Sequence, residues 1–439
     1  MLIKRNQQDE RPRPFRWWSM LALAAILFFE DACFRNLQSS ISPKTSASHQ
    51  PASCFALSPE NWSGHPFASK DRLQQIVDQL RADGGSPWNG QVPGIAATVI
   101  PADSLGDELI TAVSGYSDLA TKTRLQADSA FHIGSITKTF TAALILQLCQ
   151  EGTLSLQDSM STWIDGFSYG TDVTVEMLLS HTSGIPDFVS LPNHHPDDSP
   201  RDSINHVIDL APDFLPGSSW KYSNTNFTIL GLIAEEVTSS TWADLITRRF
   251  LKPLKLEHTY VWTGTPSKDT VSGYEPSCNY VENPACAHEE GFSLKKVRAE
   301  NADWKVAWAA GAIVSTSADV ATWMQALVTG TVLDQKHLKR MMTASPHSVA
   351  VLAQGHPYGE LVWIGYGLGL CQFRIAGDRI GWGHSGAIHG GVGNVICMMD
   401  TGDTFSLLSN YGKFDARSGL GRIGSDVYEP LRSNNDDTP

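Results

Sequence analysis

The chain has 439 residues, a formal net charge of −13 at neutral pH and 41% hydrophobic residues. A chain this long and this apolar can bury a large core, which excludes a wholly disordered protein. The acidic balance argues against a nucleic-acid-binding protein, because such a protein needs a basic surface to neutralise phosphates. The 7 cysteines are too few for a scaffold held together by disulfides.

The first 32 residues have the pattern of an export signal. Basic residues are followed by a short, mostly apolar run, Trp17–Phe29. A helix of that length spans about 20 Å, which is short of the ~30 Å hydrocarbon core of a bilayer. We therefore expect residues 1–32 to be a signal peptide or an uncleaved signal-anchor, and the protein to be periplasmic or secreted. Lipidation of Cys33 is a third alternative. An uncleaved signal-anchor or a lipidated Cys33 would attach the N-terminus to a membrane.

The next segments differ clearly in character. A Ser- and Pro-rich stretch without an apolar period predicts a flexible tether over residues 33–67. Apolar positions then recur with a helical period in Lys70–Ala82. Two β-rich runs, Ile95–Ile100 and Leu109–Val113, flank a polar turn and predict a hairpin. Thr139–Cys149 is apolar on nearly every side, which indicates a buried helix.

A mixed helical and loop region follows, and strand-like runs separated by turns begin at Gly365, with a last helix expected over 418–432. This order predicts an α/β (α+β) fold, in which an antiparallel sheet flanked by helices is interrupted by an inserted, mostly helical domain. The expected ranges are a catalytic domain at 68–432, its α/β part at about 68–150 and 300–432, its helical insertion at about 151–299, and a disordered tail at 433–439.

The segment Gly134–Lys138 stands directly before the predicted buried helix. Ser135 and Lys138 are three positions apart, so they share one face of a helix. A serine at a helix start lies where free N–H groups favour developing negative charge. A lysine beside it in a dry pocket would have a lowered pKa and could accept the hydroxyl proton. The alternative is a helix-capping serine with an exposed lysine one turn later.

The second candidate segment is Tyr222-Ser223-Asn224, which precedes a predicted helix at Ile229–Val237. A tyrosine and an amide two positions apart on an extended segment point the same way. Tyr222 could shuttle a proton, and Asn224 could hold a substrate carbonyl or amide. The alternative is an Asn-containing turn.

The third candidate segment is Gly383-His384-Ser385-Gly386-Ala387, at the end of an expected strand. Its glycines let a substrate backbone lie close to the strand. Ser385 could bind a carboxylate, and the N–H groups of Ala387 and Ser135 could form an oxyanion hole. The alternative is an ordinary Gly-rich strand turn.

Together and in this order, the three segments resemble the S-x-x-K, Y-x-N and K/H-[ST]-G triplet of the serine β-lactamase-like hydrolases. That family includes class C β-lactamases, soluble DD-carboxypeptidases, related esterases and D-aminopeptidases. The resemblance covers about residues 68–432 and includes the blocks LLSHTSGIPDF, LPGSSWKYSNTNF and GHSGAIHGG. It implies a site in the cleft between a sheet domain and an inserted helical domain.

The resemblance also assigns roles. Ser135 would be the acylated nucleophile, Lys138 and Tyr222 would handle protons, and His384 would supply electrostatics. His181, in the block Ser180–Gly184, is expected to be a buried structural histidine. No cofactor and no metal ion are implied. The substrate-binding residues implied are Asn224, Ser385, Gly386 and Ala387.

Two departures from the family pattern bear on the subclass. His384 stands where β-lactamases usually have a lysine. A histidine at this position looks more like the carboxypeptidase and esterase branches of the family. A histidine can be neutral at neutral pH. If His384 works as a charge, activity on carboxylate-bearing substrates should fall as the pH rises through its pKa. Cys371 stands in a region where the resemblance leads us to expect an arginine near the substrate carboxylate. The absence of that arginine weakens the assignment as a peptidase, because Arg374 would face the other side of its strand.

These observations predict an exported serine hydrolase that works through an acyl-enzyme, with a D-alanyl-D-alanine carboxypeptidase-like or β-lactamase-related activity as the leading hypothesis. The alternatives are an esterase or D-aminopeptidase of the same fold, and a non-catalytic sensor that binds β-lactams or peptides. The intact triplet favours an enzyme, because a sensor has no need of Tyr222. The expected ligand is a small molecule or peptide, namely a peptidoglycan stem peptide, a β-lactam or an ester.

Other motifs carry less weight. Gly166–Gly170 matches G-x-S-x-G but lacks the strand and helix of a nucleophile elbow, so we expect a loop. The His194-His195 pair is expected at the surface without a metal. Cys278 and Cys286, close together in a polar loop, are expected to form a disulfide after export. Cys149 is expected to be a free, packed thiol.

Overall fold

The computed structural model describes most of the expected catalytic domain. The predicted signal segment 1–32, the tether 33–67 and the tail 433–439 lie outside the described residues, as do Cys278 and Cys286. Within the described part of the chain, no helix is long and apolar enough to cross a membrane. The described residues are 69–83, 92–102, 109–265, 267, 269–277, 293–297, 305–354, 361–375 and 378–426.

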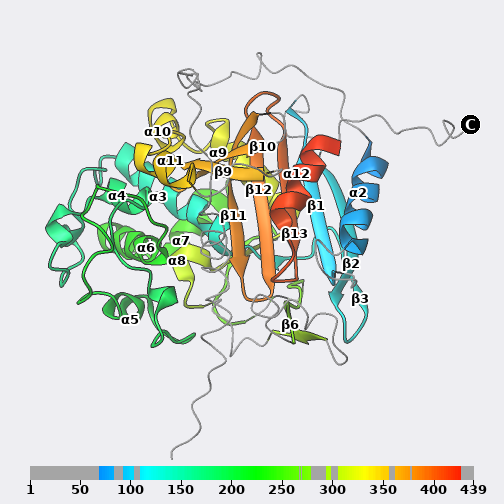
Figure 1. The fold of residues 1–439 in the computed structure, drawn as a ribbon, viewed down its shortest axis with the longest axis horizontal. Helices are drawn as coiled ribbons and strands as arrows, with labels where there is room; N and C mark the ends of the chain where they lie inside the picture. Colours follow the sequence, from blue (N-terminus) through cyan, green and yellow to red (C-terminus); the bar gives the residue numbers. More distant parts are fainter. Residues whose placement is uncertain are drawn as a thin grey trace, which may run out of the picture.

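An antiparallel sheet of eight strands forms the centre of the molecule (Figure 1). The strand order is β3-β2-β1-β13-β12-β11-β10-β9, so the hairpin near the N-terminus pairs with the last strand of the chain. The strands are β1 (Gly94–Ile100), β2 (Ile110–Asp118), β3 (Thr123–Arg124), β9 (Leu361–Tyr366), β10 (Cys371–Ile375), β11 (Arg379–Ile388), β12 (Gly391–Met398) and β13 (Thr404–Ser409).

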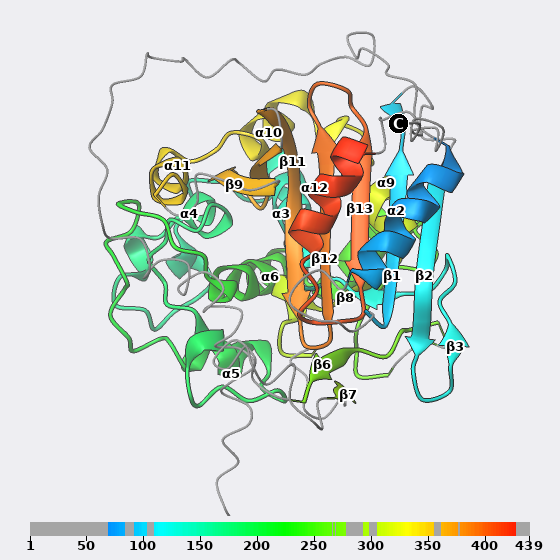
Figure 2. The same ribbon diagram turned by 45° about the vertical axis from the view of Figure 1, so that its right-hand side comes forward.

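Helices cover both faces of this sheet. Helices α2 (Lys70–Ala82) and α12 (Ala416–Asp426) lie side by side on one face, and α9 (Ser317–Val328) packs on the other (Figures 1 and 2). Every residue of β1 is buried, because alternate side chains point to opposite faces. Ile95, for example, joins the apolar cluster under α2 and α12, whereas Ala96 joins the cluster on the α9 side.

The other helices pack beside the sheet, around α3, which corresponds to the predicted buried helix (Figure 1). Phe140 of α3 stacks on Trp323 of α9 with ring centroids 3.9 Å apart, which ties the two groups of helices together. These helices are α3 (Thr137–Gln150), α4 (Val175–Leu179), α5 (Pro200–Asn205), α6 (Asn224–Thr238), α7 (Trp242–Ile246), α8 (Trp308–Gly311), α10 (Gln335–Met341) and α11 (Pro346–Leu352).

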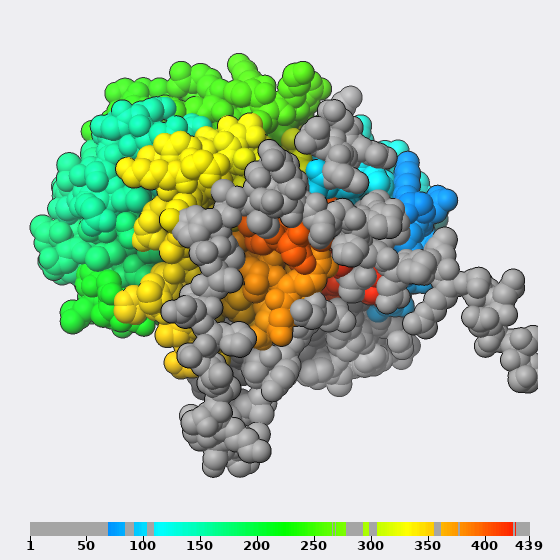
Figure 3. Space-filling view, turned by 90° about the horizontal axis from the view of Figure 1, so that it is seen from above, coloured from blue at the N-terminus to red at the C-terminus, as the bar shows by residue number. Residues whose placement is uncertain are grey.

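Two small antiparallel sheets complete the fold. In the space-filling view from above, the surface of the C-terminal strands (orange) lies between the helices that follow β8 (yellow) and the N-terminal helix α2 (blue) (Figure 3). The expected sheet flanked by helices is confirmed, and the G-x-S-x-G segment is a turn with Ser168 exposed. The strands of the small sheets are β4 (Phe131–His132), β5 (Tyr260–Val261) and β8 (Ile313–Ser315), and β6 (Tyr274–Pro276) and β7 (Leu294–Lys296).

Candidate active site

Ser135 lies in a single 3₁₀ turn, Gly134–Ile136, that leads directly into α3. Such turns are common at helix N-termini. Gly134 has φ +51°, and a Cβ there would lie 2.9 Å from both the nitrogen and the oxygen of Ala387. A side chain at position 134 would therefore collide with β11. The turn presses the backbone around Ser135 against the main chain of Ala387, as an oxyanion hole built from their N–H groups requires.

Lys138 is fully buried behind Ser135. Its Nζ lies 2.9 Å from Oγ of Ser135, 2.7 Å from Oδ1 of Asn224 and 2.8 Å from the carbonyl oxygen of Ala310. The amide and carbonyl oxygens can only accept, so they take the two N–H groups of a neutral amine. The lone pair of the nitrogen is then left for the hydroxyl proton of Ser135. Burial lowers the pKa of Lys138 to about 7, although the charge of Asp187 raises it.

Asp187 fixes the orientation of the Asn224 amide. Nδ2 of Asn224 donates to Oδ2 of Asp187 at 3.0 Å, and its backbone N–H donates to Oδ1 at 3.1 Å. Since Nδ2 is held by the carboxylate, Oδ1 must face Lys138. Sequence reasoning missed Asp187, which stands in the block LLSHTSGIPDF but in no catalytic motif. The structure therefore adds a residue that positions Asn224.

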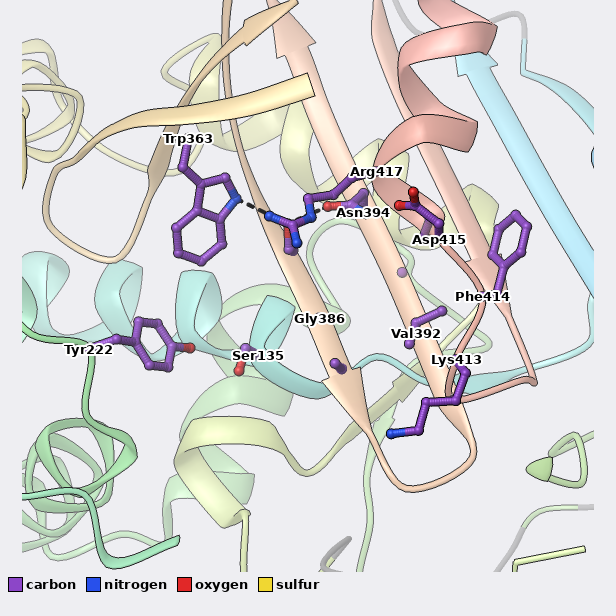
Figure 4. Close-up of a pocket in the computed structure, with 15 residues that line it drawn as sticks. Ser135, Tyr222, Trp363, Gly386, Val392, Asn394, Lys413, Phe414, Asp415 and Arg417 are labelled. Carbon is purple, nitrogen blue, oxygen red and sulfur yellow. Dashed lines mark hydrogen bonds between the residues drawn. The ribbon is translucent and has the colours of Figure 1, made fainter. Parts of the chain in front are cut away.

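Tyr222 lies across the site from Ser135. The Nζ atom of Lys138 is 4.9 Å from the centroid of the Tyr222 ring, and the hydroxyl of Tyr222 is directed toward Ser135 in Figure 4. The ring is half-buried and lines the same pocket as Ser135. Tyr222 is therefore placed to exchange a proton with a group bound at Ser135.

His384 differs from its expected role. It is fully buried and does not line the pocket. Its Nε2 lies 3.1 Å from the hydroxyl of Tyr366, and its Nδ1 lies 2.5 Å from the carbonyl oxygen of Ser385. Burial, helped by the nearby charge of Lys138, lowers the pKa of His384 to about 3. The side chain is therefore neutral at neutral pH, and the loss of activity with rising pH expected of a charged His384 is no longer predicted.

Ser385, Gly386 and Ala387 line the pocket along β11. The pairing of β10 with β11 stops at Cys371, opposite Gly383, so the rest of β11 has no neighbouring strand on that side among the described residues. Such an open strand edge can receive an extended substrate backbone.

The hydroxyl of Ser385 already has two partners. It donates to Oδ1 of Asn394 on β12 and accepts from Nε1 of Trp363 at 3.3 Å (Figure 4). A hydroxyl has a single proton, so Ser385 can donate to a substrate carboxylate only after releasing Asn394. A half-turn of the Asn394 amide would bring its Nδ2 to Ser385 and free that proton. Neither Asn394 nor Trp363 stands out in the sequence, because both are brought to Ser385 by strand pairing.

The segment before and at the start of α12 forms the remaining wall of the pocket. In Figure 4 the guanidinium of Arg417 lies between Trp363 and Asn394, and Lys413 lies beyond Val392. Both cations are half-buried, and neither has an ion pair or hydrogen bond with another described residue. Sequence reasoning missed both, because they come from the far end of the chain.

The remaining expectations concern metals and thiols. Among the described residues, no cluster of three or more His, Cys, Asp or Glu side chains is arranged to hold a metal ion. The side chain of His194 is only 6% exposed and packs against Phe188, so the expectation of a surface pair is wrong for His194, whereas His195 is exposed. Cys149 is a free thiol, as expected.

Comparisons with known proteins agree with this geometry. A family profile described as Beta-lactamase matches residues 73–423. Protein flp of Staphylococcus aureus (strain MW2) is 33% identical over 223 residues, which cover 47% of this chain and 42% of flp. A penicillin-binding protein of Bacillus subtilis (strain 168) is 32% identical over 206 residues, 45% of this chain and 44% of that protein. The chain thus spans less than half the length of these curated relatives.

Two solved structures match over most of the chain. The D-stereospecific amidohydrolase from Streptomyces has a TM-score of 0.64 and 28% identity, and the match covers 81% of this chain and 98% of that one. The D-amino acid amidase from Ochrobactrum anthropi, complexed with L-phenylalanine amide, has a TM-score of 0.67 and 26% identity, covering 81% and 96%. This chain is therefore similar in fold and in sequence to a D-stereospecific amidohydrolase and to a D-amino acid amidase.

Proposed function

The chain belongs to the Beta-lactamase family of serine hydrolases, and from that premise we propose that it is an exported, D-alanyl-D-alanine carboxypeptidase-like enzyme that works through an acyl-enzyme. The observation that carries the proposal is one pocket that holds both Ser135 and an arginine, Arg417, that has no ion pair among the described residues. A carboxypeptidase needs a nucleophile and, beside it, a group that binds the carboxylate of the leaving amino acid.

The reaction follows from the contacts of Ser135. Neutral Lys138 accepts the hydroxyl proton while Oγ attacks the substrate carbonyl. The N–H groups of Ser135 and Ala387 bind the oxyanion that forms. Tyr222 transfers a proton to the leaving amine. When water later attacks the acyl-enzyme, Tyr222 helps to remove a proton from that water.

Arg417 takes the place of the arginine that was expected near Cys371. Arg374 does not compensate, because it lies outside the pocket and its Nε is 4.0 Å from Oδ1 of Asp378. Arg417 approaches from α12, on the same side of the site as Ser385. A guanidinium and a carboxylate make paired, charge-assisted hydrogen bonds. A substrate with a free C-terminal carboxylate therefore has a defined partner.

A second candidate function is hydrolysis of D-amino acid amides. The similarity to a D-amino acid amidase at 26% identity and to a D-stereospecific amidohydrolase at 28% identity favours it. Such a substrate carries an ammonium group and no carboxylate, so it would leave Arg417 unpaired. The carboxypeptidase therefore needs Arg417 to bind its substrate, whereas the amidase does not.

The deciding experiment compares kcat/KM for a peptide ending in D-Ala-D-Ala with kcat/KM for its C-terminal amide. We expect Arg417→Ala to lower the value for the free acid by roughly 10- to 100-fold, the worth of a charged hydrogen bond, and to leave the amide unchanged. Arg422→Ala, on the same helix but paired with Asp83, is the matched control. A wild-type preference for the amide would refute the carboxypeptidase proposal and support the amidase.

Ser135→Ala tests the acyl-enzyme itself. A fluorescent penicillin should label the wild type covalently and should not label this variant, since removal of the nucleophile typically costs many orders of magnitude in rate. Residual hydrolysis above a few per cent would exclude Ser135 as the nucleophile. Absence of label on an otherwise active wild type would point to the esterase alternative.

Export and attachment are part of the same proposal. The pattern of residues 1–32 and the resemblance to a penicillin-binding protein support an envelope location. The ligand is a small molecule or peptide, and the acidic chain has no role in nucleic-acid binding. N-terminal sequencing of the protein from cell fractions distinguishes a cleaved signal, a lipidated Cys33 and a retained anchor.

A further inference from the structure

A buried chain of hydrogen bonds lies behind Tyr222 and uses three residues that the mechanism above leaves without a task. Nε2 of His181 lies 3.2 Å from the hydroxyl of Tyr366, and the same hydroxyl lies 3.1 Å from Nε2 of His384. All three side chains are 0% exposed. His181 follows α4, whereas the other two residues stand on β9 and β11, so the chain joins the helical part of the molecule to the sheet.

The partners of His181 fix its tautomer. Its Nδ1 lies 3.2 Å from the backbone nitrogen of Ser223 and 3.1 Å from Nδ2 of Asn226. The Asn226 amide is itself oriented, because its Oδ1 accepts from Ser183 at 2.7 Å. Both neighbours of Nδ1 are donors, so Nδ1 carries no proton and a neutral His181 is protonated on Nε2. That N–H donates to the oxygen of Tyr366.

The remaining protons follow in order. The hydroxyl proton of Tyr366 is left to donate to Nε2 of His384, because its oxygen already accepts from His181. His384 must then carry its proton on Nδ1, where it donates to the carbonyl oxygen of Ser385. Burial lowers the pKa of both histidines and raises the pKa of Tyr366, so all three groups are neutral. Each donor has one acceptor. The two donors at Nδ1 set the tautomer of His181, and the Tyr366 hydroxyl then sets the tautomer of His384.

The two ends of this chain hold two parts of the active site. At one end, the His181 ring lies against the Tyr222 ring with centroids 4.3 Å apart. The backbone N–H groups on both sides of Tyr222 donate to His181, that of Ser223 to Nδ1 and that of Lys221 to the carbonyl oxygen at 3.1 Å. At the other end, His384 binds the backbone of the strand that lines the pocket.

We propose that Tyr366 is a positioning residue whose hydroxyl links His181 to His384, fixes the tautomer of His384 and thereby holds Tyr222 and β11 in register with Ser135. The proposal rests on the proposed function in one respect, namely that Tyr222 transfers protons during acyl transfer. It also accounts for a histidine at position 384, because a neutral imidazole can join this chain through both ring nitrogens, one as acceptor and one as donor, whereas a lysine in its ammonium form has no acceptor to offer.

The first test measures the tautomers in the unmodified protein. Long-range ¹⁵N–¹H correlation spectra of histidine-labelled enzyme report which ring nitrogen carries the proton. We expect His181 as the Nε2–H form and His384 as the Nδ1–H form. A protonated His384, or His384 as the Nε2–H form, would overturn the proposal. This test needs no substrate, so its outcome does not depend on whether the protein is a carboxypeptidase.

The second test is Tyr366→Phe, which removes the hydroxyl and keeps the ring. We expect kcat to fall by roughly 10- to 100-fold, as for a small misplacement of a catalytic group, while KM changes less than two-fold. In the same variant the fixed tautomer of His384 should be lost. Tyr169→Phe is the matched control, because the Tyr169 hydroxyl is buried and has no hydrogen-bond partner among the described residues. Unchanged kcat in Tyr366→Phe, or an equal loss in the control, would refute the positioning role.

Discussion

Replacing Lys138 by methionine should abolish acylation and yet make the fold relatively more stable at low pH. The ammonium of Lys138 is fully buried, and burial lowers its pKa from 10.5 to about 7. In the unfolded chain the pKa returns to 10.5. Between these two values the unfolded state binds one more proton than the native state, so the native state gains stability as the pH rises through this window. Below pH 7 both states are protonated, and the wild type carries the full cost of a buried charge.

The size of the effect follows from the shift. A pKa unit is worth about 1.4 kcal/mol, so the drop from 10.5 to about 7 corresponds to about 5 kcal/mol. Methionine has no charge to bury. The unfolding free energy of Lys138→Met minus that of the wild type should be most positive below pH 7. It should then fall by about 1.4 kcal/mol for each pH unit between 7 and 10. The three lost hydrogen bonds add an offset that does not depend on pH.

Urea unfolding of both proteins at pH 6, 7, 8 and 9, followed by tryptophan fluorescence, measures this slope. Groups that titrate equally in both proteins cancel in the difference. Lys336→Met, at an exposed position, is the control, and its difference from the wild type should be flat. A flat difference for Lys138→Met would refute the reasoning, since it would mean that Lys138 is not desolvated enough to act as a neutral base.

Two further predictions concern the site, and one concerns a predicted disulfide. Tyr222→Phe should slow both acylation and deacylation in stopped-flow measurements, and unchanged turnover would remove Tyr222 from the mechanism. Gly386→Ala would place a Cβ 1.9 Å from a backbone oxygen at the base of the Ser135 turn; it should push this turn off β11 and lower the acylation rate, whereas Gly424→Ala on α12, with open space around it, should not. Non-reducing peptide mapping of exported protein should link Cys278 to Cys286, and fragments without that mass link would contradict the predicted disulfide.

Local patterns in the sequence were enough to predict the centre of the site. The spacing of Ser135 and Lys138 at a helix start predicts that their side chains meet, and Oγ of Ser135 lies 2.9 Å from Nζ of Lys138. The helical period of Lys70–Ala82 matches α2 to the residue. Both inferences rest on neighbours within one or two turns, where the geometry of the backbone alone decides which side chains share a face.

The surroundings of the site could not be predicted in this way. Arg417 reaches the pocket only because α12 packs across the sheet, and Asp187 meets Asn224 across 37 residues of chain. The role of His384 depends on burial and on the hydroxyl of Tyr366, neither of which the motif encodes. Charge, pKa and rotamer at these positions are properties of the packed molecule, so they appear only once distant segments are brought together.

The pairing of β1 with β13 has a consequence for how this protein is made. The hydroxyl of Ser409 donates to the carbonyl oxygen of Gly94 at 3.0 Å, across 315 residues of sequence. Contacts between residues so far apart in sequence form late, because the entropic cost of closing a very long loop must be met before they can form. A chain emerging from the ribosome can pair β1 with β2, but it lacks the second partner of β1 until β13 has been synthesised. Since residues 413–417 line the pocket, we expect chains that end before them to be inactive, and the pocket to be complete only after this last segment has been synthesised.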